Sequence, residues 1–253
     1  MPVAHIDFHS VLIMAVAGFY AGTQNVLAGG GSFITFPTLL LVGLNPLAAN
    51  MTSTIALFPN QITSAIAGRS LLSDVGSLSF RRLFLASCLG GICGAMLLLN
   101  TPVTIFAKLV PWLVLFATSI FAWGTYRRKP LHAVHAVSPT LLIVIQTCIA
   151  IYGGYFGGGI GFLMLAALTI AGLPVRAASA NKNFLAMTMN ASAVLIFAFS
   201  PLVNWQAVIA LGVGGIGGGF FGSWLLHRVS EKLLRGFIIL VGTVLTIWLF
   251  IRI

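Results

Sequence analysis

The chain has 253 residues, of which 59% are apolar and only 6% are charged, and its mean hydropathy is +1.07. A soluble domain carries about a quarter charged residues, so this composition excludes an ordinary soluble surface and leaves no room for a soluble catalytic domain. The net charge of +10 comes from basic residues in short loops between apolar runs. That pattern predicts membrane orientation rather than nucleic-acid binding.

Ten apolar segments fill the chain, and a full helical crossing needs about 20 residues. Two segments, 32–43 and 160–172, are too short to cross, and each directly follows three consecutive glycines. We interpret each as the end of a broken element, which either completes a crossing or returns as a re-entrant hairpin. The segments are expected at 10–28, 32–43, 47–68, 82–100, 104–126, 138–156, 160–172, 177–200, 205–226 and 232–251.

The basic residues give these segments a direction. When the chain is traced through its crossings, ten of the thirteen Lys and Arg residues fall on one face, which the positive-inside rule makes cytoplasmic. Both termini then lie outside. Each half holds one broken element and three full helices, so the second half runs inverted relative to the first. The ten residues are Arg69, Arg81, Arg82, Arg127, Arg128, Lys129, Arg176, Arg228, Lys232 and Arg235.

An internal repeat supports the same division. A shift of 129 residues places Gly29 and Gly30 on Gly158 and Gly159. The same shift superimposes a Gly-Leu pair and an Ala-Ala pair that follow in each half. The expected fold is therefore an all-α integral membrane protein of two inverted-topology repeats, 1–130 and 131–253. Small residues in both halves predict close helix packing. They are Ala86, Gly90 and Gly94 in one half and Gly214, Gly218 and Gly222 in the other.

Polar residues recur on the helix that follows each broken element. Both sets have the spacing i, i+3, i+4 and i+11, which places each on one helical face. Such stripes either bond across helices as structural glue or line a wet cavity, and two matching stripes favour the cavity. The first set is Asn50, Ser53, Thr54 and Gln61, and the second is Ser179, Lys182, Asn183 and Asn190.

Lys182 is the most specific of these signals because it lies about one and a half turns into its helix. It either extends to the cytoplasmic interface or faces a substrate, and its place on the polar stripe favours the second interpretation. The glycine runs, Gly29 to Gly31 and Gly157 to Gly159, leave backbone amides at a positive helix end, where an anion can dock. No carboxylate or histidine lies within a predicted span. A small anion is therefore the expected ligand, with no metal, cofactor or catalytic group.

These residues also resemble a known family over about residues 10–250. The runs "AGTQNVLAGGGSFITFPTLLLVGLNPLAANMTSTIAL" and "GGYFGGGIGFLMLAALTIAGLPVRAASANKNFLA" look like the sulfite exporter TauE/SafE family, also called the toluene-sulfonate uptake permease family. The paired glycine motif, the Thr52-Ser53 step and its counterpart Asn181-Lys182 carry the resemblance. One departure is Gln24-Asn25, where smaller apolar residues are expected, and this difference bears on substrate choice.

The resemblance implies a carrier of sulfite, sulfonates or related organic anions in the cytoplasmic membrane of a prokaryote, with either export or uptake as its direction. We expect an alternating-access secondary transporter, and export is the favoured direction. An uptake permease, a channel-like uniporter, a membrane-embedded enzyme and a membrane assembly factor are the alternatives. The expected partners are the substrate anion and the lipid bilayer, without nucleic acid. The sequence does not predict the oligomeric state.

Overall fold

A computed structural model of the chain describes residues 7–27, 30–126, 138–225 and 231–252. All ten predicted apolar segments are confirmed as α-helices within these ranges, and a short 3-10 helix (Arg69–Leu71) follows the third. The helices are α1 (Phe8–Leu27), α2 (Ser32–Leu41), α3 (Pro46–Gly68), α4 (Phe80–Leu99), α5 (Val103–Tyr126), α6 (Pro139–Tyr155), α7 (Ile160–Ile170), α8 (Val175–Phe197), α9 (Trp205–Leu225) and α10 (Glu231–Arg252).

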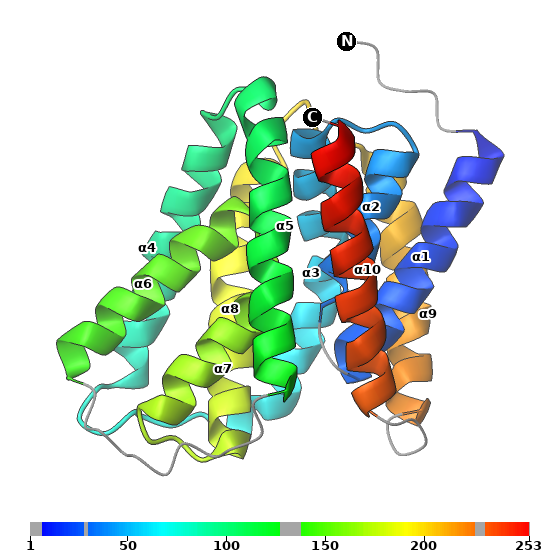
Figure 1. Cartoon of the computed structure of the whole chain (residues 1–253). Coiled ribbons are helices and arrows are strands. Elements are labelled where there is room, and N and C mark those ends of the chain that lie inside the picture. The colour runs from blue at the N-terminus through cyan, green and yellow to red at the C-terminus, as the bar shows by residue number, and fades with distance from the viewer. Residues whose placement is uncertain (1–6, 28–29, 127–137, 226–230, 253) are drawn as a thin grey trace.

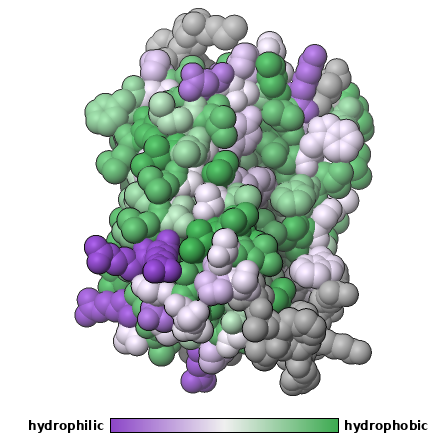
Figure 2. Space-filling view, turned by 90° about the vertical axis from the view of Figure 1, so that its left-hand side faces the viewer, coloured by the Kyte–Doolittle hydropathy of each residue, from purple (hydrophilic) through white to green (hydrophobic). Residues whose placement is uncertain are grey.

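The outer surface is suited to lipid. Helices α4, α5 and α9 contain apolar stretches of sufficient length to cross a membrane. Large apolar side chains point outward, and Phe199 and Phe220 are 88% and 77% exposed. In Figure 2 apolar side chains cover most of the visible face, and the hydrophilic ones gather mainly at its lower end. The expected all-α integral membrane protein is therefore confirmed.

The two broken elements are hairpins that enter from opposite ends of the molecule. In Figure 1, α1 runs down from the top, and α2 returns so that α3 also begins at the top. Helix α6 runs up from the bottom, and α7 returns so that α8 begins at the bottom. Within each pair the two helices pack against each other. The structure therefore favours the re-entrant alternative for both short helices.

The ends of the molecule differ in charge as the topology predicts. Helix α1 begins and α10 ends at the top of Figure 1. The exposed Arg69, Arg81, Arg82 and Arg176 lie on segments at the bottom. Arg127, Arg128, Lys129 and Arg228 lie outside the described residues. The bottom of Figure 1 is thus the face that the positive-inside rule assigns to the cytoplasm.

Helix packing follows the same scheme in the two halves. Helices α3 and α8 pack together at the centre, α1 packs on α9 at one side, α6 packs on α4 at the other, and α5 contacts α10. The predicted close approaches are confirmed. A Cβ atom on Gly94 would overlap the backbone of Ile151, and one on Gly218 would overlap the backbone of Phe19.

The same turn ends both short helices. Gly43 after α2 has φ 92° and Gly172 after α7 has φ 98°, a left-handed conformation that favours glycine. The next residues, Leu44 and Leu173, donate equivalent backbone hydrogen bonds of 3.0 and 3.1 Å. Each glycine is 129 residues from its counterpart, so the two halves share this turn at the shift that the sequence predicts.

Candidate functional site

A cavity of about 800 Å³ lies between α3 and α8, beside the first turns of α2 and α7. Of the fifteen binding residues predicted from sequence, thirteen line it. Gly29 lies outside the described residues. The thirteen are Gly30, Gly31, Asn50, Ser53, Thr54, Gln61, Gly157, Gly158, Gly159, Ser179, Lys182, Asn183 and Asn190.

Asn181 is not among the residues that line the cavity. Its side chain is fully buried, donates to the carbonyl oxygen of Ser73 at 2.7 Å and accepts from the Ser73 amide at 3.1 Å. One residue along a helix turns a side chain by about 100°, so Asn181 points away from the cavity that its neighbour Lys182 faces. The contacts of Asn181 therefore attach α8 to the loop after α3.

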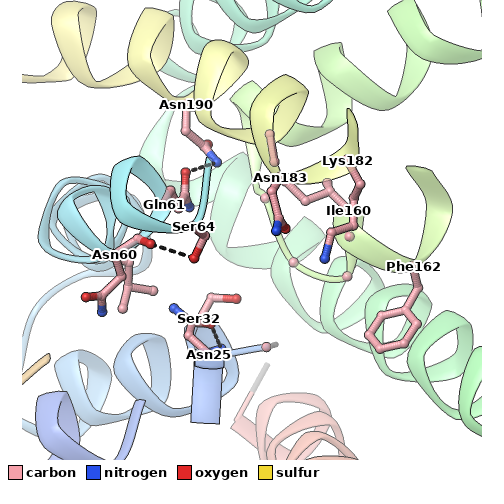
Figure 3. Close-up of a pocket in the computed structure, with 18 of the residues that line it drawn as sticks. Asn25, Ser32, Asn60, Gln61, Ser64, Ile160, Phe162, Lys182, Asn183 and Asn190 are labelled. Atoms are coloured by element: carbon pink, nitrogen blue, oxygen red, sulfur yellow. Dashed lines mark hydrogen bonds between the residues drawn. The ribbon is translucent and has the colours of Figure 1, made fainter. Parts of the chain in front are cut away.

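Lys182 lies beside the start of α7. A Cβ atom built on Gly161 would be 3.7 Å from Cδ and 3.9 Å from Nζ of Lys182. Figure 3 shows the lysine side chain extending toward Ile160, the first residue of α7. The amides of a helix's first turn have no partner within the helix and carry a partial positive charge. Two positive groups therefore converge at one side of the cavity.

The left-handed conformation of Gly159, with φ 74°, forms the start of α7. Its counterpart at the start of α2, Gly30, has φ 85°. The two starts differ in how their amides are used, because the Gly31 amide donates to Asn25 Oδ1 at 2.8 Å. Asn25 therefore caps the first glycine loop from within the protein. No side chain of the described residues forms an equivalent hydrogen bond at the second loop.

The two stripes meet at the centre of the molecule. Asn190 Nδ2 donates to Gln61 Oε1 at 2.9 Å, and the two residues are 129 positions apart (Figure 3). Asn50 Nδ2 also crosses between the halves and donates to the carbonyl oxygen of Tyr155 at 3.0 Å. The stripes thus act both as interhelical contacts and as cavity lining.

Several cavity residues lay outside the sequence prediction. Asn60 lies just before Gln61, the last member of the α3 stripe, and Ser64 lies about one turn beyond it, so the same periodicity would have found both. Asn25 stood out only as a departure from the family pattern. Arg176 was assigned to membrane orientation alone, yet it also lines the cavity.

The cavity opens at the arginine-bearing end. Its exposed lining residues include Leu71 after α3 and Arg176 at the start of α8. Helix α3 ends and helix α8 begins at the bottom of Figure 1. Toward the other end the lining is buried, and Phe36 meets Phe156 with ring centroids 5.8 Å apart. Close to the Phe36–Phe156 contact, the hydroxyl groups of Thr35 and Ser53 are hydrogen-bonded at 2.6 Å, and this bond holds α2 against α3. The cavity is therefore accessible from one side of the molecule.

Comparison with known proteins agrees with this architecture. The sequence profile of the family described as "Sulfite exporter TauE/SafE" matches residues 14–249. The "Probable membrane transporter protein ORF9" of Sinorhizobium sp is 29% identical, over 96% of this chain and 93% of that protein. The "Probable membrane transporter protein YfcA" of Escherichia coli strain K12 is 27% identical, over 94% of this chain and 89% of that protein. A "Probable membrane transporter protein" of Haemophilus influenzae is 24% identical, over 95% of this chain and 94% of that protein. With a cavity open to one face and a family match over nearly its whole length, the chain belongs to the sulfite exporter TauE/SafE family of membrane transporters.

Proposed function

We propose that the protein is a secondary transporter that exports small sulfur-containing or organic anions, such as sulfite and sulfonates, across the cytoplasmic membrane. The observation that carries this proposal is the convergence of Lys182 and the start of α7 at one side of the cavity. A cation and a positive helix end at one side of a cavity both attract an anion. Among the described residues that line the cavity, the charged side chains are Lys182 and Arg176, both positive.

The lining chemistry supports an anion rather than a metal or a cation as cargo. Sites for divalent metal ions in proteins usually include carboxylates, imidazoles or thiolates. The described residues contain no group of three or more His, Cys, Asp or Glu side chains placed to bind a metal. The cavity instead offers an ammonium group, backbone amides, hydroxyls and carboxamides, which suit a bound anion.

Alternating access is the proposed mechanism, with the two halves as an inverted repeat. The hairpins α1–α2 and α6–α7 enter from opposite ends, and inverted repeats of this kind place a binding site between discontinuous helices. The present structure opens at the arginine-bearing end, which we assign to the cytoplasm. In the opposite state, the Phe36–Phe156 contact would part while the arginine-bearing end closes. Export is favoured by the family's description as sulfite exporters.

Flux measurements in proteoliposomes test the proposal. Uptake of radiolabelled sulfite, taurine and sulfoacetate is measured with and without an imposed pH gradient and membrane potential. Saturable, gradient-sensitive flux is expected for at least one of them. Flux that rises linearly with concentration and shows no exchange would instead indicate a channel.

A matched pair of variants tests the role of the lysine. Lys182→Met should reduce anion flux to background because it removes the cation at the site. Lys108→Met makes the same chemical change at an exposed position on α5, outside the cavity lining, and should retain flux. Equal anion flux through both folded variants would show that Lys182 does not bind the substrate. It would therefore refute the argument from the convergence of Lys182 and the start of α7.

A further inference from the structure

The polar face of α8 extends from the centre of the cavity to its mouth. Arg176 lies three positions before Ser179 and seven before Asn183, and this spacing places the three side chains on one face of the helix. All three line the cavity, as does Lys182. Arg176 and Lys182 are six positions apart, or about 9 Å along the helix axis. Because Arg176 is exposed at the open end, an anion that enters there passes it before it reaches Lys182.

Membrane orientation alone does not explain this placement. Arg81 is the second residue of α4, as Arg176 is the second residue of α8, and both side chains are exposed on the face assigned to the cytoplasm. The positive-inside rule accounts for a basic residue at either position. It does not account for a basic side chain in the wall of a cavity, and Arg176 lines the cavity whereas Arg81 does not. The two arginines therefore form a matched pair.

Among the described side chains, no carboxylate forms an ion pair with Arg176. Asp7 precedes α1, which begins at the opposite end of the molecule, and Asp74 accepts a hydrogen bond from the Phe80 amide at 2.7 Å. The positive charge of Arg176 is also unfavourable for its own helix, because the dipole of α8 is positive in the first turn. Arg176 can therefore use its charge for a ligand without breaking an ion pair of the described fold.

The first half of the chain has no equivalent of this cation. At the shift of 129 residues Arg176 corresponds to Leu47, the second residue of α3, which is buried. Helix α3 begins at the top of Figure 1, whereas α8 begins at the bottom. The charged residues among the described cavity lining, Arg176 and Lys182, both belong to the second half. The repeated architecture therefore does not require a cation at this position, and the arginine is a feature of one mouth.

We infer that Arg176 is an entry site, which draws the anion into the cytoplasmic mouth of the cavity before the anion binds at Lys182. Charges of one sign in a cleft raise the local concentration of an oppositely charged ligand and its rate of association. The charge of Arg176 also acts on an anion already bound at Lys182, because salt at about 10 mM screens charges only over about 30 Å. Removal of this charge therefore weakens anion binding. The inference rests on the proposed function, because it uses the same anion and the same cavity.

Calorimetry on the purified full chain tests the inference with two probes, ethanesulfonate with one negative charge and sulfoacetate with two. Arg176→Gln should weaken ethanesulfonate binding about threefold to tenfold at about 10 mM salt, the size expected for two charges about 9 Å apart near a protein surface. The loss should be larger for sulfoacetate. For ethanesulfonate it should fall below about twofold at about 0.5 M salt, where the charges are screened. Arg81→Gln makes the same change in net charge outside the cavity and should leave both dissociation constants unchanged.

Two further variants separate the charge of Arg176 from the shape of its side chain. Arg176→Lys keeps the charge and should bind both probes with nearly the parental affinity. Arg176→Glu reverses the charge and should weaken binding more than Arg176→Gln does. A carboxylate in the first turn of α8 stabilises the helix, so weaker binding in Arg176→Glu would not come from loss of that helix.

The outcomes separate this inference from the proposed function. Parental affinity in Arg176→Gln at low salt, a loss that does not change with salt, or an equal loss in Arg81→Gln would overturn the inference. If Lys182→Met abolishes binding in those cases, the central anion site stands. If neither probe binds the folded parent protein, or if Lys182→Met binds both probes as the parent does, the inference and the proposed function both fail.

Discussion

Replacing Gly218 with alanine should separate α1 from α9, whereas the same change at the adjacent Gly217 should not. A Cβ atom on Gly218 would overlap the carbonyl group of Phe19, a backbone atom that cannot move independently of α1. A Cβ atom on Gly217 would meet only the Phe19 ring, at 3.6 Å, which is ordinary contact. Because the two positions are neighbours on one helix, they form a matched pair.

The magnitude follows from three contributions. Alanine stabilises a helix relative to glycine by about 1 kcal/mol, and this gain is common to both variants. Overpacking at Gly218 costs about 1–3 kcal/mol. Moving α1 also weakens the hydrogen bond from Thr23 Oγ1 to the Gly218 carbonyl, 3.0 Å long, which is worth about 0.6 kcal/mol between membrane helices. The two variants should therefore differ by about 2–4 kcal/mol.

Thermal unfolding in detergent measures this difference. For a chain of this size, 1 kcal/mol corresponds to about 2–4 °C in Tm, so Gly218→Ala should unfold on the order of 5–10 °C below Gly217→Ala. Gly217→Ala should match or slightly exceed the parent protein. Equal melting temperatures for the two variants would show that α1 and α9 do not approach each other as closely as described.

Three further predictions concern other parts of the structure. The side chain of Ser10, and after it the Ser10 amide, stabilise the Asp7 carboxylate and hold its pKa below the ordinary value of 3.8. The stabilisation of the α1 start is therefore present above that value and is lost as the pH falls through the lowered pKa, so amide exchange in the first turn should rise in acid relative to Asp7→Asn. Asn181→Ala should lower the free energy of unfolding by about 2 kcal/mol, because two partly buried hydrogen bonds to Ser73 are lost, while anion affinity is retained; a loss of affinity in folded protein would place Asn181 in the site. In a cysteine-free background, Ser64→Cys in the cavity should react with a membrane-impermeant thiol reagent only from the cytoplasmic side, and Asn100→Cys after α4 only from outside; the reverse pattern in oriented vesicles would invert the topology.

The helices and the cavity lining could be predicted because their signals are local. A membrane crossing requires a long apolar run, so the ends of the ten helices fall within about three residues of the expected segments. Polar residues are costly in such runs, so a recurring spacing already indicates a shared face. Lys182 and Asn183 were identified in this way, and both line the cavity.

The path of the chain after each glycine run could not be predicted from the same signals. Both a completed crossing and a returning hairpin fit a short apolar helix, and the choice depends on packing between α1 and α2 or between α6 and α7. Asn181 shows a related limit. Its partner, Ser73, lies in a loop 108 residues away, and its place next to Lys182 in sequence says nothing about that contact.

The differences between the halves are as informative as their likeness. If the two halves form the proposed inverted repeat, their equal architecture allows the molecule to open to either side of the membrane, but it does not orient a ligand in the cavity. The ligand is oriented by residues that differ between equivalent positions of the two halves. Lys182 corresponds to Ser53, and Gly154 corresponds to Asn25, so the second half supplies the cation while the first half caps its own glycine loop. An anion that interacts more strongly with one half keeps its charged group there in both states, and transport then requires the cavity walls to move around a ligand of fixed orientation.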